Sequence, residues 1–134
     1  MRFLRFCVFA IFVILAAWGL CMTEMPLFVK VHDWNLWLLQ RTQRFPRSLR
    51  HSYTDRLEKL AFDFEELILR ANSARGRQRR EWLEAADSVL SRQRALLRYA
   101  GDLQLLAVNQ LRYASEQLDQ LGRLLGAWLK GTDR

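Results

Sequence analysis

The stretch that decides the fold is residues 102–130, DLQLLAVNQLRYASEQLDQLGRLLGAWLK. It contains no proline, and its apolar residues recur every three or four positions, which is the spacing of one face of an α-helix. Asp102 is a good N-cap, and Lys130 with Gly131 suits the C-terminal end. We therefore predict a helix over 102–130, roughly 40 Å long, which needs partner helices of similar length. Its predicted apolar stripe consists of Leu103, Ala107, Leu111, Ala114, Leu118, Leu121, Leu125 and Trp128.

Three further segments show the same helical periodicity. The predicted helices are 26–45, 47–72 and 78–100, with a polar loop at 73–77. The first ends at Phe45, because the residue before a proline avoids the helical conformation, and Pro46 can open the next helix. Gly101 is the predicted C-cap of the third. Short connections imply antiparallel neighbours, so the predicted fold is all-α, an up-down-up-down four-helix bundle formed by the body of the chain, 25–134.

Residues 1–24 form a separate apolar leader, which we place outside the bundle. Its segment 6–22 has no charge and follows two arginines. Three interpretations remain open: a signal peptide without a clean cleavage site, an inner-membrane anchor through residues 3–22, or a misplaced start with translation beginning at Met22 or Met25. Because every helical stripe lies after the leader, we expect the body to fold without it and to be cytoplasmic.

The body contains no recognisable catalytic set. Both cysteines, Cys7 and Cys21, lie in the leader, and the only histidines are His32 and His51. No E-x-x-H pair of a di-iron bundle and no phosphate-binding glycine loop occurs. The sequence therefore predicts a protein that is not an enzyme and needs no metal or cofactor.

Basic residues dominate the charge of the body, with 19 Lys and Arg against 13 Asp and Glu. Most of them are arginines, whose planar guanidinium pairs with phosphate oxygens and stacks on bases. The alternative is a solvated helix face. In an up-down bundle, the arginines around 41–50 and those around 75–80 lie at opposite ends. The predicted nucleic-acid-binding residues are Arg41, Arg44, Arg47, Arg50, Arg75, Arg77, Arg79, Arg80, Arg92, Arg94 and Arg98.

Two features indicate contact between copies of the chain. Segment 26–45 carries more apolar surface than a four-helix core can use, including Trp34 and Trp37. Gly122 and Gly126 share one strip of a predicted helix, where glycine is unfavourable by ~1 kcal/mol unless another helix approaches closely. Packing inside the bundle explains the two glycines equally well.

Three motifs, in this order and spacing, carry a family resemblance: FPRSLR at 45–50, LEKLAFDFEELILRAN at 57–72 and LRYASEQLDQLGRLLGAWLK at 111–130. They resemble the Avd proteins, the accessory variability determinants of diversity-generating retroelements. More loosely, the chain is similar to four-helix proteins encoded in intervening sequences of large ribosomal RNA. The match covers nearly the whole body and leaves the leader without a counterpart.

The resemblance implies a function that neither composition nor periodicity shows. Avd proteins are four-helix bundles that assemble into a basic pentamer. They bind the retroelement's reverse transcriptase and nucleic acid, and they support error-prone copying of a template RNA without an active site of their own. For this chain it implies a reverse transcriptase, RNA or DNA, and copies of itself as partners. The alternatives are a structural or membrane-tethered bundle, or the intervening-sequence relative.

Overall fold

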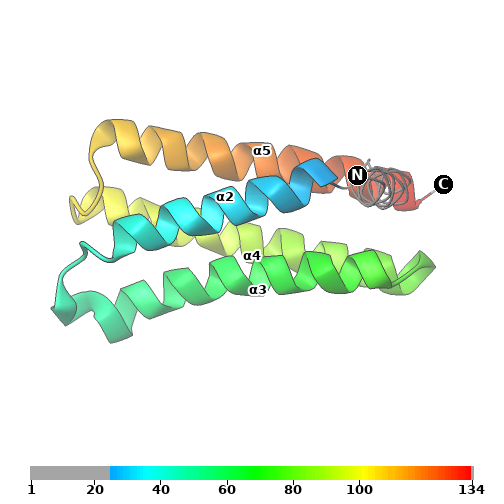
Figure 1. Cartoon of the computed structure of the whole chain (residues 1–134), viewed down its shortest axis with the longest axis horizontal. Coiled ribbons are helices and arrows are strands. Elements are labelled where there is room, and N and C mark those ends of the chain that lie inside the picture. Colours follow the sequence, from blue (N-terminus) through cyan, green and yellow to red (C-terminus); the bar gives the residue numbers. More distant parts are fainter. Residues whose placement is uncertain (1–24, 134) are drawn as a thin grey trace, which may run out of the picture.

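The computed structural model describes residues 25–133, which form four long helices and no strand (Figure 1). The all-α prediction is therefore confirmed for this part of the chain. None of the helices within these residues has both the length and the apolar character needed to cross a membrane. The leader, with its predicted anchor at residues 3–22, lies outside the described residues. The helices are α2 (Met25–Thr42), α3 (Asp55–Ser73), α4 (Gly76–Asp102) and α5 (Val108–Thr132).

Each helix runs back along the one before it, as the colours of Figure 1 show. Hydrogen bonds agree with this course: Asn35 donates to Glu65 at 3.0 Å, and Thr42, seven residues later on α2, donates to Glu58, seven residues earlier on α3. The segments 43–54 and 103–107 both lie at one end, which we call the two-connection end. The opposite end, with the 74–75 turn between α3 and α4, is the single-turn end.

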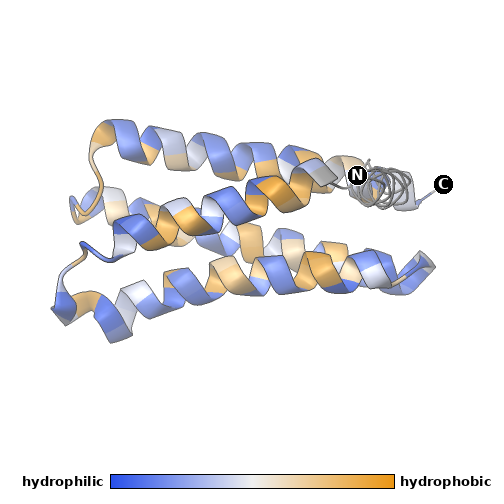
Figure 2. Cartoon of the chain, in the orientation of Figure 1, coloured by the Kyte–Doolittle hydropathy of each residue, from blue (hydrophilic) through white to orange (hydrophobic). Residues whose placement is uncertain are grey.

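The core is formed by the stripes that the periodicity predicts. Hydrophobic and hydrophilic residues are interleaved along every helix in Figure 2, as expected for amphipathic helices that share one core. Burial of each large apolar side chain contributes roughly 1.5–3 kcal/mol. The largest side chains with almost no exposure are Trp34, Leu38, Leu57, Phe64, Ile68, Leu83, Leu90, Leu118, Leu121 and Leu125.

A polar side chain, Gln93, interrupts the stripe of α4 and is completely buried. The indole N–H of Trp34 donates to its Oε1 at 3.0 Å, and its Nε2 donates to the carbonyl of Leu60 at 3.3 Å. One amide therefore links α2, α3 and α4 and satisfies the buried indole, which would otherwise be unfavourable in an apolar core.

The start of the last helix was predicted wrongly. Asp102 is not an N-cap but the last residue of α4, and α5 begins at Val108 after a short loop. The left-handed residue that ends α4 is Gln104 (φ 57°), not Gly101. The N–H of Leu105 bonds the carbonyl of Ala100 at 2.9 Å, and that of Gln104 bonds the carbonyl of Gly101 at 3.0 Å, which is a Schellman motif.

Gly101 serves packing instead of capping. A Cβ at this position would lie 2.7 Å from a methyl carbon of Leu111, so any larger residue would require the Leu111 side chain to move. The later start of α5 also leaves two predicted stripe residues, Leu103 and Ala107, exposed in the loop, whereas Leu106 enters the core.

The first connection also differs from prediction. The first helix stops at Thr42 rather than at Phe45, although Phe45 itself is buried. A 3-10 turn (Arg47–Leu49) and a π-helical turn (Arg50–Thr54) then lead directly into α3, so the helical course does begin at Arg47. The buried hydroxyl of Tyr53 donates to the carbonyl of Leu96 at 2.7 Å and fixes this segment on α4.

Candidate nucleic-acid interface

The arginines of the first connection lie at the two-connection end without close carboxylate partners. Arg44 and Arg47 are exposed and form no ion pair with the described residues. Arg50 lies 3.9 Å from Asp55, at the limit of an ion pair. Arg41 is half-buried, with its guanidinium 5.5 Å from the centroid of the Trp37 ring. These side chains keep their charge available to an anionic ligand.

The predicted cluster Arg92, Arg94 and Arg98 is divided between two grooves. Arg92 lines the groove between α3 and α4, together with Arg56 and Lys59. Arg94 and Arg98 instead line the groove between α4 and α5. Arg94 is committed within the chain, because it donates to the carbonyl of Leu118 at 3.1 Å and its Nε lies 3.6 Å from Asp119. Arg92 and Arg98 form no ion pair with the described residues.

At the single-turn end, carboxylates one helical turn away neutralise two of the four predicted arginines. Arg77 pairs with Glu81 at 3.0 Å. Arg80 pairs with Glu84 at 2.8 Å and also contacts Asp133. The hydrogen bond that Arg80 donates to Glu84 is the main reason that the pKa of Arg80 is raised.

Arg79 has a structural role that the sequence did not reveal. Its Nε donates to the carbonyls of Ala71 and Ala74, at 3.0 and 2.8 Å, which are orphan acceptors at the end of α3. Its guanidinium also lies 5.8 Å from the centroid of the Trp128 ring. Arg79 therefore joins the ends of α3 and α5. Arg75, beside it, is exposed.

The two tryptophans predicted to contact other copies are engaged within the chain. Trp34 is 1% exposed and has almost no surface to offer. Trp37 stacks on Trp34, with centroids 5.6 Å apart, and its ring also contacts Tyr113 at 5.1 Å. The surplus apolar surface of α2 instead comprises Val29 and Leu36, both about half exposed.

The two glycines on α5 differ in their surroundings. A Cβ on Gly122 would lie 2.5 Å from Nη2 of Arg94, so this glycine makes room for the arginine that crosses α5. Packing within the chain therefore explains Gly122. A Cβ on Gly126 would meet nothing within 4 Å, so this position remains open to a second copy.

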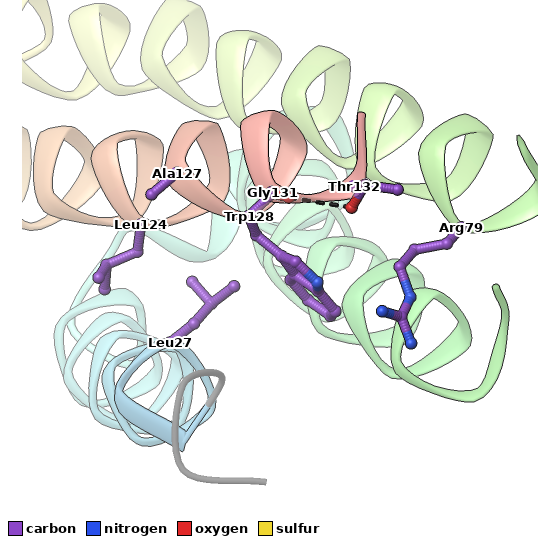
Figure 3. Close-up of a pocket in the computed structure, with 7 residues that line it drawn as sticks. All are labelled: Leu27, Arg79, Leu124, Ala127, Trp128, Gly131 and Thr132. Atoms are coloured by element: carbon purple, nitrogen blue, oxygen red, sulfur yellow. Dashed lines mark hydrogen bonds between the residues drawn. The ribbon is translucent and has the colours of Figure 1, made fainter. Parts of the chain in front are cut away.

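A pocket of about 510 Å³ lies at the single-turn end between the start of α2 and the end of α5 (Figure 3). Leu27, Leu124 and the ring of Trp128 line it, and the guanidinium of Arg79 lies on the far side of that ring in the view shown. It contains no carboxylate, histidine or hydroxyl nucleophile apart from Thr132, which donates to the carbonyl of Trp128. Within residues 25–133, no group of three or more His, Cys, Asp or Glu could hold a metal ion.

Sequence reasoning missed several residues that the structure adds to the basic surface. Arg56 and Lys59 lie beside Arg92. Arg112 and Tyr113 lie at the start of α5, at the two-connection end. The sequence showed only that Arg112 and Tyr113 lie off the main apolar stripe. The contact of the Tyr113 ring with Trp37 on α2 appears only in the fold.

A comparison with protein families agrees with this architecture. The family described as bAvd-like matches residues 27–132, which include all four helices almost completely. The chain belongs to the bAvd-like family. This confirms the resemblance that its three motifs indicated. No curated protein matches the chain.

Proposed function

We propose that this bAvd-like protein is a non-catalytic accessory protein of a diversity-generating retroelement. It binds the element's reverse transcriptase and its template RNA or the DNA copy, and so supports mutagenic reverse transcription. Its protomer is the up-down-up-down bundle. Family membership over residues 27–132 carries this proposal. The arginines at the two-connection end, which lack close carboxylate partners, support it.

The nucleic acid contacts the two-connection end. Arg44, Arg47 and Arg98 are exposed there without a carboxylate partner among the described residues. Each such arginine that meets a phosphate releases condensed counterions, so affinity falls steeply with salt and depends weakly on sequence. Arg77 and Arg80 at the other end are already paired, so a phosphate would have to displace a carboxylate.

Copies of the chain assemble into a ring, a pentamer as in the Avd proteins. One bundle offers only a small basic surface, and a ring repeats that surface around an axis. Val29 and Leu36 on α2 and the open position Gly126 on α5 are the candidate contacts between copies. Gly126→Leu then lowers the oligomer mass without lowering the melting temperature of the protomer, because leucine is the better helix former, and light scattering with thermal unfolding separates the two effects.

Contact with the polymerase needs an explanation, because reverse transcriptases are typically basic as well. Template RNA can lie between the two proteins as shared counter-charge. Alternatively, the acidic residues Asp63, Glu66, Glu81, Glu84 and Asp87 can face the polymerase. The first four are each bound to a basic side chain of the same helix, whereas Asp87 forms no ion pair with the described residues. These pairings support RNA as the bridge, since four of the five carboxylates are already neutralised.

Co-purification with the reverse transcriptase encoded nearby tests the proposal. With RNA as the bridge, association is lost after ribonuclease treatment and survives Glu84→Lys with Asp87→Lys. With a direct acidic contact, it survives ribonuclease and is lost in the charge-reversal variant. If neither condition gives association, the proposed function is wrong, and the intervening-sequence relative becomes the better assignment.

A further inference from the structure

A stack of aromatic rings leads from the core to the surface between α2 and α5. The buried ring of Trp34 stacks on Trp37, with an interplanar angle of 20°. Trp37 in turn contacts the ring of Tyr113, with centroids 5.1 Å apart. Tyr113 is 40% exposed, so the stack ends in a ring that is open to solvent.

One cation lies against this aromatic stack, and two more arginines lie close to it along the chain. The guanidinium of Arg41 lies 5.5 Å from the centroid of Trp37, and its Nε is buried with no hydrogen-bond partner among residues 25–133. Arg44 lies in the turn just after α2, where its N–H bonds the carbonyl of Arg41 at 3.1 Å, and Arg112 is the residue before Tyr113 on α5. Neither arginine forms an ion pair within the described part of the chain.

This combination suits one class of ligand. An exposed aromatic ring stacks on the flat face of a nucleobase, and nearby guanidinium groups contact the phosphates on either side. Only an unpaired base has a free face, because the bases of a duplex are stacked on each other. The ring of Tyr113 is already held by Trp37, so binding would order few additional side-chain rotamers.

We propose that Tyr113 stacks an unpaired base of single-stranded nucleic acid, while Arg41, Arg44 and Arg112 contact the adjacent phosphates. The protein therefore prefers single strands to duplexes of the same length. This inference rests on the proposed function, and it adds to that function the class of nucleic acid and the site that selects it.

Fluorescence anisotropy of labelled 12-mers tests this with the full-length chain, using uridine RNA, thymidine DNA and a 12-base-pair duplex as probes. Tyr113→Ala is expected to weaken single-strand binding about tenfold, as for loss of one stacked base. The affinity for duplex should change less than about twofold, and the salt slope should stay constant, because no charge is removed. Tyr113→Phe keeps the ring and should restore binding.

Tyr99→Ala is the matched control. Tyr99 is 57% exposed on α4, near the two-connection end, and it has no ring contact within the described residues. Its replacement should leave both affinities within about twofold of the wild type. Equal losses on RNA and DNA with Tyr113→Ala indicate recognition of the base face. A loss on RNA alone indicates that RNA is the ligand. Both results support the proposal.

Other results would overturn the stacking proposal, and they distinguish its failure from a failure of the proposed function. If the wild type binds no probe, both fail. If it binds, but Tyr113→Ala weakens single-strand and duplex binding equally or not at all, only the stacking site is wrong. If the variant loses oligomer mass by light scattering, Tyr113 contacts a second copy and the base-stacking assignment is wrong.

Discussion

The two ends of the bundle contain similar numbers of cations but use them differently. The half towards the two-connection end, residues 34–64 and 89–120, has 10 Lys and Arg against 6 Asp and Glu, a net charge of +4. The other half, residues 25–33, 65–88 and 121–133, has 8 against 7, a net charge of +1. Its arginines are mostly paired one turn along a helix or bound to carbonyls. Arginine density alone therefore does not locate a binding surface.

The difference between the ends follows from where each arginine lies on its helix. Arg77 and Arg80 are each followed four residues later by glutamate, which is the spacing that brings side chains together on a helix surface. Arg44 and Arg47 lie in an irregular connection, where no such regular spacing operates. The structure thus pairs one set of arginines with carboxylates of the same helix and leaves the other set without such partners.

The largest expected effect on stability comes from Tyr53 at the two-connection end. Burial raises the pKa of Tyr53 to about 12, above its ordinary value of 10. The stabilisation that the neutral Tyr53 hydroxyl gives to the folded state is therefore fully present below pH 10. As the pH rises from 10 towards 12, the tyrosine of the unfolded chain loses its proton first, and the free energy of unfolding falls by roughly 2–3 kcal/mol.

At neutral pH, Tyr53→Phe should lower the free energy of unfolding by about 1 kcal/mol, because the hydrogen bond is lost. The free energy of unfolding of this variant should not fall at alkaline pH as that of the wild type does. Urea unfolding of both proteins between pH 8 and 11.5 measures the difference. The two stabilities should converge and then cross as the pH rises. A constant difference over this range would show that the Tyr53 hydroxyl titrates normally.

The next largest effect is a loss of stability at the single-turn end. Arg79→Ala should lower the free energy of unfolding by about 2 kcal/mol, because it removes the donor to the last carbonyls of α3 and the cation over the Trp128 ring. The folded variant should bind nucleic acid as the wild type does. Thermal unfolding and anisotropy check the two parts. A loss of affinity in a variant of unchanged stability would place a ligand at this end.

The smallest expected effect is a gain in stability on replacing Gln104. This residue is held at φ 57°, a conformation that glycine adopts without steric penalty. Gln104→Gly should therefore raise stability by roughly 1 kcal/mol, measured by urea unfolding. Gly101→Ala, only three residues away, should leave the stability nearly unchanged, because the better helix propensity of alanine is offset by the movement of the Leu111 side chain that its Cβ would require. If Gly101 were the cap instead, Gly101→Ala would destabilise the protein by about 1 kcal/mol and Gln104→Gly would give no gain.

Sequence reasoning predicted the helices and their core well, because burial along a stripe depends on periodicity alone. Leu83, Leu90 and Leu97 needed no knowledge of their partners. The start of α5 was missed because Asp102 and Gly101 both carry capping signals that packing overrides. Gln104 gave no such signal.

The candidate site was predictable only in part, because a side chain's partners come from other helices. Arg79 and Arg80 look alike in sequence, yet one caps α3 and the other pairs with carboxylates. Trp34 was predicted to lie at a surface, but Gln93 holds it in the core. Tyr113 becomes a candidate only once α5 lies beside Trp37.

The most direct test of the account compares the salt dependence of RNA affinity in two double variants. Arg44→Ala with Arg47→Ala removes unpaired charges at the two-connection end, and Arg77→Ala with Arg80→Ala removes paired charges at the single-turn end. We predict that the first flattens the slope of log affinity against log salt by about 2 units and weakens binding on the order of 100-fold at 0.1 M salt. The second should change the slope by less than about 0.5 units. Equal slopes in the two variants, or the larger change in the second, would contradict the central claim that nucleic acid binds at the two-connection end.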